Sequence, residues 1–174
     1  MKRLFLILAL ICSVTTASAQ VKDHGVKFIG ALGSSVSWVH ELKIGYEGTS
    51  FGAFAPLADV SVGGMVNSNL FLGAGVGYNA VFFAGSYKKY AAAHEGKVFV
   101  HGRYYFTPSY GQTVLFDCKF GYNRAFSDTQ SALGLFFGPG YLFADRYAVS
   151  VGYSGSFYKD GGIHGVAAQF SVEF

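Results

Sequence analysis

Residues 163–174 (IHGVAAQFSVEF) alternate between apolar side chains and small or polar ones up to the last residue. The apolar positions include Phe170, Val172 and Phe174, and the polar ones include Glu173. A period of two places successive side chains on opposite faces of a β-strand. The segment is therefore expected to be a strand with one apolar face and one polar face.

The same alternation recurs in seven further segments, so eight strands are expected. Their expected ranges are 36–46, 54–66, 70–83, 96–106, 112–123, 131–143 and 147–157. Strands of this length suit a tilted crossing of a bilayer, which takes about 9 to 11 residues. Residues 26–32 are either a short extra strand or a segment that leads into the first strand. Pro139 predicts a bulge or an unpaired position in the sixth segment.

The composition favours a closed barrel in a membrane. Charged residues make up 13% of the chain, whereas about 25% is usual, and Gly, Phe and Tyr number 24, 18 and 12. After the first twenty residues, no run of 18 apolar residues could form a spanning helix. Because lipid satisfies no open sheet edge, strands cross a membrane only as a barrel. The expected fold is an all-β, eight-stranded, antiparallel, up-and-down transmembrane β-barrel.

The connections and the aromatic residues suggest how this barrel is oriented. Short connections at 67–69, 107–111 and 144–146 alternate with generally longer, more polar ones, as in outer-membrane barrels with short periplasmic turns. Aromatic residues of the apolar faces are expected in two belts at the two interfaces. The belt toward the loops comprises Tyr46, Phe54, Phe82, Phe83, Tyr122 and Phe157; the belt toward the turns comprises Phe106, Phe143, Tyr147 and Phe174. The apolar faces are therefore expected to meet lipid, and the polar faces the lumen.

The polar faces carry a set of ionisable residues that is nearly balanced in charge. These residues are Glu41, Lys43, Asp59, His101, Arg103, Asp117, Lys119 and Glu173. A buried charge costs several kcal/mol unless it is paired, so a mutually satisfied structural network is expected, with Arg103 and Asp117 as a pair on neighbouring strands. Eight strands enclose room only for side chains or one small ligand. A catalytic or transport role for these residues is the alternative.

The first nineteen residues have the form of an export signal. Lys2 and Arg3 precede an apolar stretch, and Ala17-Ser18-Ala19 predicts cleavage before Gln20. Residues 1–19 are thus expected to be a signal peptide, 20–35 a lead-in segment and 36–174 the barrel. Lipid attachment at Cys12 is a rival, which the bulky Ile11 disfavours. Cys118 would then be the only cysteine of the exported chain and is expected to be a small apolar residue.

Several classes of function find little support in the sequence. Without Lys2 and Arg3, the 13 basic residues fall to 11 against 10 acidic ones, so nucleic acid is not an expected partner. The five histidines lack paired ligand spacing, so no metal site is expected. No cofactor and no catalytic residue are expected, and the protein is not expected to be an enzyme. Lys88 and Lys89 in the loop at 85–95 could contact lipopolysaccharide phosphates.

The chain resembles the small eight-stranded outer-membrane barrels of Gram-negative bacteria, the OmpA/OmpX-like and OmpW-like superfamily. It is most similar to families described as "outer membrane protein beta-barrel domain". The segments that carry this resemblance are NSNLFLGAGVGYN, VHGRYYF, LFDCKFGYN and the terminal FSVEF. The resemblance implies location in the outer membrane and a C-terminal signal, Phe170, Val172 and Phe174, that the barrel assembly machinery reads. It implies no specific activity.

Three functions remain open on this reading. The leading hypothesis is a structural or interaction protein with a filled, charge-paired lumen and external loops as its contact surface. The second is an OmpW-like channel for a small apolar solute. Its lumen would use the space left by inward glycines and be lined by Phe136 and Leu142. The third is a lipid A modifying enzyme with candidate residues His94, Ser127, Asp128, Ser156 and His164, which share no recognisable motif.

Overall fold

The structure is a computed structural model that describes residues 25–40, 51–84, 92–107, 112–126, 130–159 and 161–174. At 38–40, 51, 83, 84, 92 and 93 it describes the backbone alone. Several expected features lie outside the described residues and stay predictions. They are the signal peptide at 1–19, Tyr46, Glu41, Lys43, Lys88 and Lys89.

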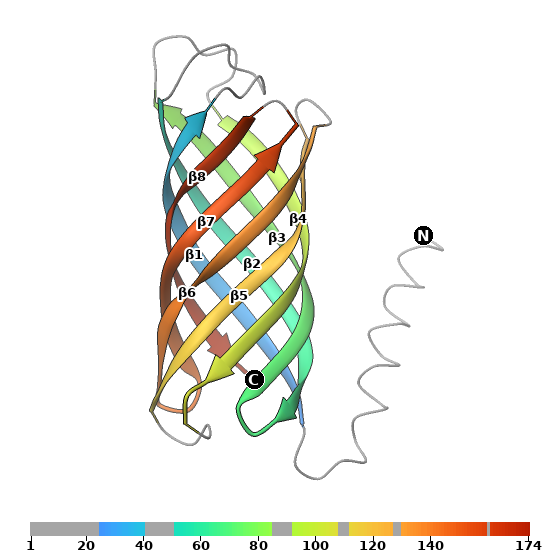
Figure 1. The fold of residues 1–174 in the computed structure, drawn as a ribbon, viewed down its shortest axis with the longest axis vertical. Coiled ribbons are helices and arrows are strands. Elements are labelled where there is room, and N and C mark those ends of the chain that lie inside the picture. Colours follow the sequence, from blue (N-terminus) through green and yellow to red (C-terminus); the bar gives the residue numbers. More distant parts are fainter. Residues whose placement is uncertain (1–24, 41–50, 85–91, 108–111, 127–129, 160) are drawn as a thin grey trace, which may run out of the picture.

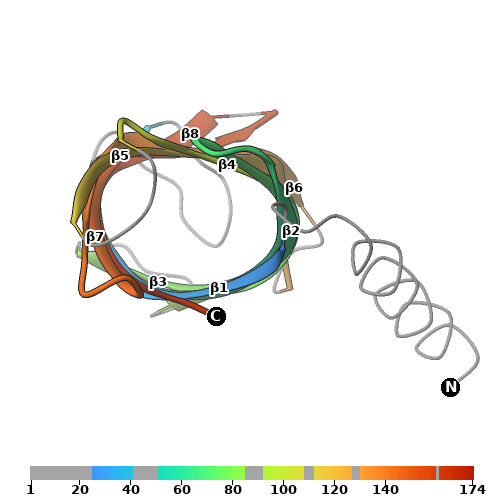
Figure 2. The ribbon, with the colours of Figure 1, turned by 90° about the horizontal axis from the view of Figure 1, so that it is seen from below.

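Eight antiparallel strands form one closed barrel, as expected (Figure 1). The strands are β1 (Val26–His40), β2 (Phe51–Asn67), β3 (Leu70–Ala84), β4 (Ala92–Tyr105), β5 (Thr113–Ala125), β6 (Ser131–Phe143), β7 (Tyr147–Tyr158) and β8 (Gly161–Glu173). Each strand pairs with its neighbour in the sequence, and β1 pairs with β8 to close the ring seen in Figure 2. Closure leaves no strand edge unpaired toward lipid.

The first strand lies earlier in the sequence than expected. It was predicted at 36–46 with 20–35 as a lead-in, but β1 runs from Val26 to His40 and is paired on both sides. Ile29 is fully buried in the lumen, and Leu32 faces outward with 65% of its surface exposed. Gly30, Gly33 and two serines interrupt the apolar alternation here, which is why its period was weak in the sequence.

One other local expectation differs from the structure, and one is confirmed. The fourth strand was expected to begin at Gly96, but β4 begins at Ala92, so Glu95 belongs to the strand rather than to a loop. The register shift lies between Met65 and Asn67 on β2. The pairing of β6 with β7 skips Gly138 and Pro139, while the pairs on either side, Phe137 with Tyr153 and Gly140 with Ser150, keep one register. Pro139 therefore marks an unpaired position toward β7, as expected, and causes no bulge.

Two of the short turns have recognisable local chemistry. Asn67 accepts a hydrogen bond through Oδ1 from the amide of Asn69, at 2.8 Å, which closes the turn between β2 and β3. Between β6 and β7, Ala144 and Asp145 have φ angles of 51° and 60°. Two consecutive left-handed residues match the twist of a β-hairpin, although alanine adopts this conformation at a cost.

The outer wall of the barrel is apolar. Large exposed side chains include Val36 at 63%, Val100 at 59% and Phe120 at 52%. Exposed aromatics of the two expected belts include Phe54, Phe82, Tyr122 and Phe157 toward the loops, and Phe106, Tyr147 and Phe174 toward the turns. A continuous apolar band flanked by aromatics is the surface of a membrane-spanning barrel. Within the described residues, no helix is long and apolar enough to cross a membrane.

The lumen has an apolar layer near each end and polar side chains between them. Toward the turns the buried cluster comprises Ile29, Phe71, Tyr105, Leu115, Leu142 and Ala148. Toward the loops it comprises Ala53, Ala55, Val81, Ala125, Ala132, Tyr158 and Ile163. Along β5 the inward positions run from Leu115 through Asp117, Lys119 and Asn123 to Ala125. Most of the charged residues therefore lie between the two apolar clusters, whereas Lys27, at the turn end, keeps 25% of its side chain exposed.

Candidate functional site

The centre of the polar interior is an ion pair between Arg103 on β4 and Asp117 on β5. The two residues lie directly opposite each other in the register of these strands. Arg103 donates from Nε to Asp117 Oδ1 at 2.7 Å and from Nη2 to Oδ2 at 2.6 Å. Both side chains are 1% exposed. A bidentate pair of this kind is a strong charge-assisted interaction, and it is the pair expected from the sequence.

Arg103 also reaches across the lumen to β8. Its Nη1 donates to Glu173 Oε1 at 2.6 Å, and its Nη2 donates to the Ser171 hydroxyl at 3.0 Å. Glu173 Oε1 accepts a second hydrogen bond from the Tyr105 hydroxyl at 2.8 Å, while Oε2 lies 3.1 Å from Lys27 Nζ. The guanidinium thus joins two carboxylates, and each carboxylate has further donors.

A serine, a histidine and an aspartate form a chain beside this pair. His101 lies between them, with Nδ1 2.7 Å from Ser61 Oγ and Nε2 2.9 Å from Asp117 Oδ1. These are the residue types of a hydrolytic triad. Ser61 is 1% exposed and His101 0%, and the ring of Phe71 packs edge-on against His101 with centroids 5.3 Å apart. The chain is therefore packed as core, because the serine hydroxyl has no access to a substrate.

A second ion pair lies closer to the loops. Lys119 Nζ donates to both carboxylate oxygens of Asp59, at 2.8 and 2.9 Å, and to Gln169 Oε1 at 2.8 Å. Lys97 Nζ is 4.0 Å from Asp59 Oδ2. One carboxylate thus faces two ammonium groups, of which Lys119 is the closely bonded one.

Glu95 is a buried carboxylate of the lumen near the loop end of β4. Its Oε1 accepts a hydrogen bond from the Tyr158 hydroxyl, and its Oε2 accepts one from Asn79 Nδ2 at 3.4 Å. Glu95 is 1% exposed. Nearby, Asn123 Nδ2 donates to the Ser156 hydroxyl at 2.9 Å. Together these contacts extend the polar interior toward the loop end of the barrel.

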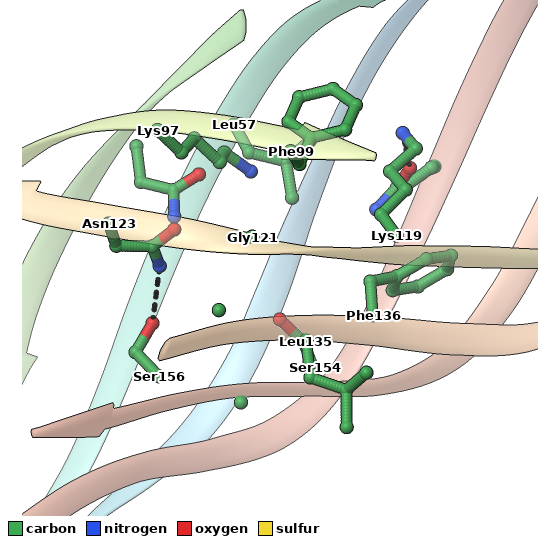
Figure 3. Close-up of a pocket in the computed structure, with 14 residues that line it drawn as sticks. Leu57, Lys97, Phe99, Lys119, Gly121, Asn123, Leu135, Phe136, Ser154 and Ser156 are labelled. Carbon is green, nitrogen blue, oxygen red and sulfur yellow. Dashed lines mark hydrogen bonds between the residues drawn. The ribbon is translucent and has the colours of Figure 1, made fainter. Parts of the chain in front are cut away.

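A small cavity of about 40 Å³ lies next to these residues (Figure 3). Its lining includes Lys97, Phe99, Asn123 and Phe136. Asn79 also lines it, and its Oδ1 is the one buried side-chain polar atom without a hydrogen-bond partner among the described residues. One water needs about 10–15 Å³ of such space. The cavity therefore has room for a few water molecules at most.

Inward glycines on β3 make room for aromatic rings from neighbouring positions. A Cβ at Gly75 would lie 2.5 Å from Cζ of Phe99, and one at Gly73 would lie 2.7 Å from Cζ of Phe71. Both distances are far shorter than a van der Waals contact. The glycine row expected from the sequence is present, but side chains fill the space that it leaves.

The structure brings together six of the eight charge-network residues expected from the sequence: Asp59, His101, Arg103, Asp117, Lys119 and Glu173. Sequence reasoning missed Lys27, Glu95 and Lys97 as members of the network. Lys97 shares its strand face with Arg103, so the alternation of β4 already pointed to it. Lys27 and Glu95 were missed because their strands were expected to start later.

The candidate residues for a lipid A modifying enzyme do not converge. His94 and His164 lie on the outer face of the barrel, whereas Ser156 is buried in the lumen. Ser127 and Asp128 lie outside the described residues. Within the described ranges, no group of three or more His, Cys, Asp or Glu residues could hold a metal ion.

No protein-family model and no curated protein sequence matches this chain. Among solved structures, it is similar to Neisserial surface protein A (NspA), with 16% identity and a TM-score of 0.57 over 86% of this chain and 99% of that one. It is also similar to the N-terminal β-barrel domain of OprF from Pseudomonas aeruginosa (14% identity, TM-score 0.49, 86% of this chain and 97% of that one). A third match is Ail from Yersinia pestis, solved with the heparin analogue sucrose octasulfate (14%, 0.45, 86% and 99%). The closed barrel of the structure and its likeness to NspA together show that this chain has the fold of the small eight-stranded outer-membrane β-barrels.

Proposed function

We propose that this protein is an integral outer-membrane barrel that acts as a structural or interaction protein, with its external loops as the contact surface. The observation that carries the proposal is the filled lumen. Arg103 is 1% exposed and holds both Asp117 and Glu173 across the barrel, so the ion network ties β4, β5 and β8 together from within. A network of this kind supports a rigid barrel rather than a water-filled path.

Transport of a small apolar solute finds less support. The cavity of about 40 Å³ is far smaller than the roughly 300 Å³ at which pockets for small molecules begin. Of the two residues expected to line a channel, Phe136 lines this cavity, but Leu142 belongs to the apolar cluster toward the turns. Within the part of the lumen that the structure describes, no observation favours passage of a solute over a closed barrel.

Enzymatic activity also finds little support. The Ser61–His101–Asp117 chain is the arrangement closest to catalytic chemistry, and its burial argues for a structural role. A fluorophosphonate reagent that labels activated serines is expected to leave the folded protein unmodified by mass spectrometry. Labelling of Ser61 in the folded barrel would contradict the non-enzymatic proposal.

The proposed partners follow from this location. Phe170 and Phe174 face outward with 43% and 74% exposure, as residues read by the barrel assembly machinery would. Export by a cleaved signal peptide at 1–19 is part of the same proposal. Lipids and lipopolysaccharide of the outer membrane are the proposed surroundings of the apolar wall.

Solute flux into proteoliposomes tests the proposal. Liposomes that contain the folded protein are compared with protein-free liposomes. In solutions of small sugars they are expected to swell no faster than the protein-free ones, and they are expected to take up apolar solutes no faster. A double variant, Arg103→Ala with Glu173→Ala, removes the central cross-lumen contact and serves as the comparison. Rapid uptake by the wild-type protein would refute the proposal of a closed lumen.

A further inference from the structure

The few ionisable side chains on the outer wall gather at one end of the barrel. Among outward strand positions whose side chains the structure describes, Arg124 on β5 is the only Lys, Arg, Asp or Glu. His94 on β4 and His164 on β8 are the only histidines there. All three lie close to the loop ends of their strands. At the turn end, the described outward strand positions are uncharged.

Arg124 and His94 belong to one cluster that spans β3, β4 and β5. Tyr78 and Arg124 lie opposite Gly96 on its two sides, so the three positions form a row across the sheet. His94 is the next outward residue of β4 toward the loops and therefore lies diagonal to Arg124, at roughly 7–8 Å between backbones. Phe126 leans over Gly96, with Cζ 2.7 Å from where a Cβ would be. The Phe126 ring therefore fills the space over Gly96, between the positions of Tyr78 and Arg124.

The tyrosine holds the histidine in one orientation. The Tyr78 hydroxyl is hydrogen-bonded to His94 Nδ1, and the rings stack with an interplanar angle of 24°. When the phenol donates to Nδ1, the neutral imidazole carries its hydrogen on Nε2. His94 and Arg124 are both exposed, so in the tautomer in which the phenol donates, an Nε2 donor and a guanidinium are available on the same patch of wall. Among the described residues, no carboxylate forms an ion pair with Arg124.

We propose that Arg124, His94 and Tyr78 form a binding site for a phosphate group of lipid A in the outer leaflet. A guanidinium and a neutral N–H donor suit a phosphate, which accepts several charge-assisted hydrogen bonds. Arginine on the lipid face of a barrel is tolerated near an interface, where its cost falls to about 0–1 kcal/mol. This proposal rests on the outer-membrane location that the proposed function includes. It adds one specific lipid contact to that location.

The asymmetry of the wall favours lipid A over a phospholipid. In an asymmetric outer membrane, phospholipids occupy mainly the periplasmic leaflet, so a phospholipid site would be expected toward the turns. Arg124, the one Lys or Arg at the described outward strand positions, lies toward the loops, the external side of an outer-membrane barrel, whereas the exposed Arg146 lies in the turn between β6 and β7 and not on the wall. A lipid confined to the outer leaflet matches this distribution.

Lipid binding to the full chain, folded in detergent micelles, tests the site. The probes are bisphosphorylated lipid A, monophosphorylated lipid A and phosphatidylglycerol, with affinities measured by native mass spectrometry. Arg124→Gln is expected to weaken the binding of bisphosphorylated lipid A roughly fivefold, the contribution of one arginine near an anionic surface. Arg124→Lys should retain most of the affinity, and His94→Gln should lose part of it.

His164→Gln is the matched control. His164 Nδ1 is bonded to the Tyr153 hydroxyl at 2.6 Å, but its cross-strand partners are Gly155 and Trp38 rather than a cation. This variant should bind lipid A as the wild type does. The gel shift between boiled and unboiled samples checks that each variant is a closed barrel.

Three results would overturn the proposal: unchanged lipid A affinity in Arg124→Gln, an equal loss in His164→Gln, or equal binding of phosphatidylglycerol by the wild type. The last result would indicate a general phosphate site. Solute flux is measured independently of lipid binding, so failure of this site and failure of the closed-lumen proposal give different outcomes.

Discussion

Arg103 and Asp117 face each other across neighbouring strands and share two hydrogen bonds, of 2.7 and 2.6 Å, inside a closed barrel. The contact sits in an interior where Asp117 also accepts hydrogen bonds from His101 and Ser150. Removing either Arg103 or Asp117 therefore leaves the other charge buried without its bidentate partner, which destabilises the folded barrel.

The first prediction concerns this pair. Asp117→Leu leaves the Arg103 cation without its bidentate partner and is expected to destabilise the barrel by about 3–5 kcal/mol. The double variant Arg103→Met with Asp117→Leu leaves no buried cation at that place and is expected to be more stable than Asp117→Leu alone. Urea unfolding in lipid vesicles measures both. A double variant as unstable as the sum of the two single variants would contradict this account.

The sequence predicted this pair because two simple regularities determine it. Alternation places Arg103 and Asp117 on the lumen side, and the short turn between their strands makes those strands neighbours. The contacts of Arg103 with Glu173 and of Lys119 with Asp59 cross the lumen between strands that are not adjacent. Such contacts depend on the stagger of the strands around the barrel, which no single strand reveals.

Strand boundaries were the other part that could not be predicted. Lys27 and Glu95 lie near the beginnings of β1 and β4, where small residues weaken the apolar period. Arg124 was not predicted to lie on the outer wall, because the fifth strand was expected to end at Asn123. Its place on the wall became clear only from the extent of β5, which ends at Ala125.

Gly75 and Gly102 give a second prediction, on packing. Gly75→Ala would place a Cβ 2.5 Å from both Cζ of Phe99 and the carbonyl oxygen of Val60, so a loss of about 1–3 kcal/mol is expected from overpacking. Gly102→Ala is the control, because its nearest neighbour would be Leu72 Cδ2 at an ordinary 3.6 Å. The same urea titration compares them. Equal stability of the two variants would argue against a filled lumen at Gly75.

The turn between β6 and β7 gives a third prediction. Ala144 has a φ of 51°, a left-handed conformation that costs about 1–2 kcal/mol for a residue with a Cβ. Ala144→Gly removes this cost but adds about 0.4–1 kcal/mol of unfolded-chain entropy. A small net gain in stability is therefore expected. Ala168→Gly, within β8, should instead lower stability by about 0.5–1 kcal/mol; a gain there, or a loss at Ala144, would contradict this reasoning.

A fourth prediction separates assembly from stability at Phe174. Its amide donates to the Phe28 carbonyl at 2.8 Å and its carbonyl accepts from the Phe28 amide at 3.0 Å, whereas its ring is 74% exposed. Phe174→Ala keeps both backbone bonds, so the urea midpoint should change little while the amount of protein in the outer membrane falls. Phe126→Ala, which removes a ring with 62% exposure at the opposite end, is the control. Normal membrane levels of Phe174→Ala would refute the assembly role.

The closed lumen is tested most directly by ion conductance across planar lipid bilayers. The wild-type protein is expected to give no stable channels, because apolar layers near both ends enclose a paired charge network around Arg103. Stable, ion-selective conductance by the wild type that disappears when Arg103 or Asp117 is replaced would contradict the account.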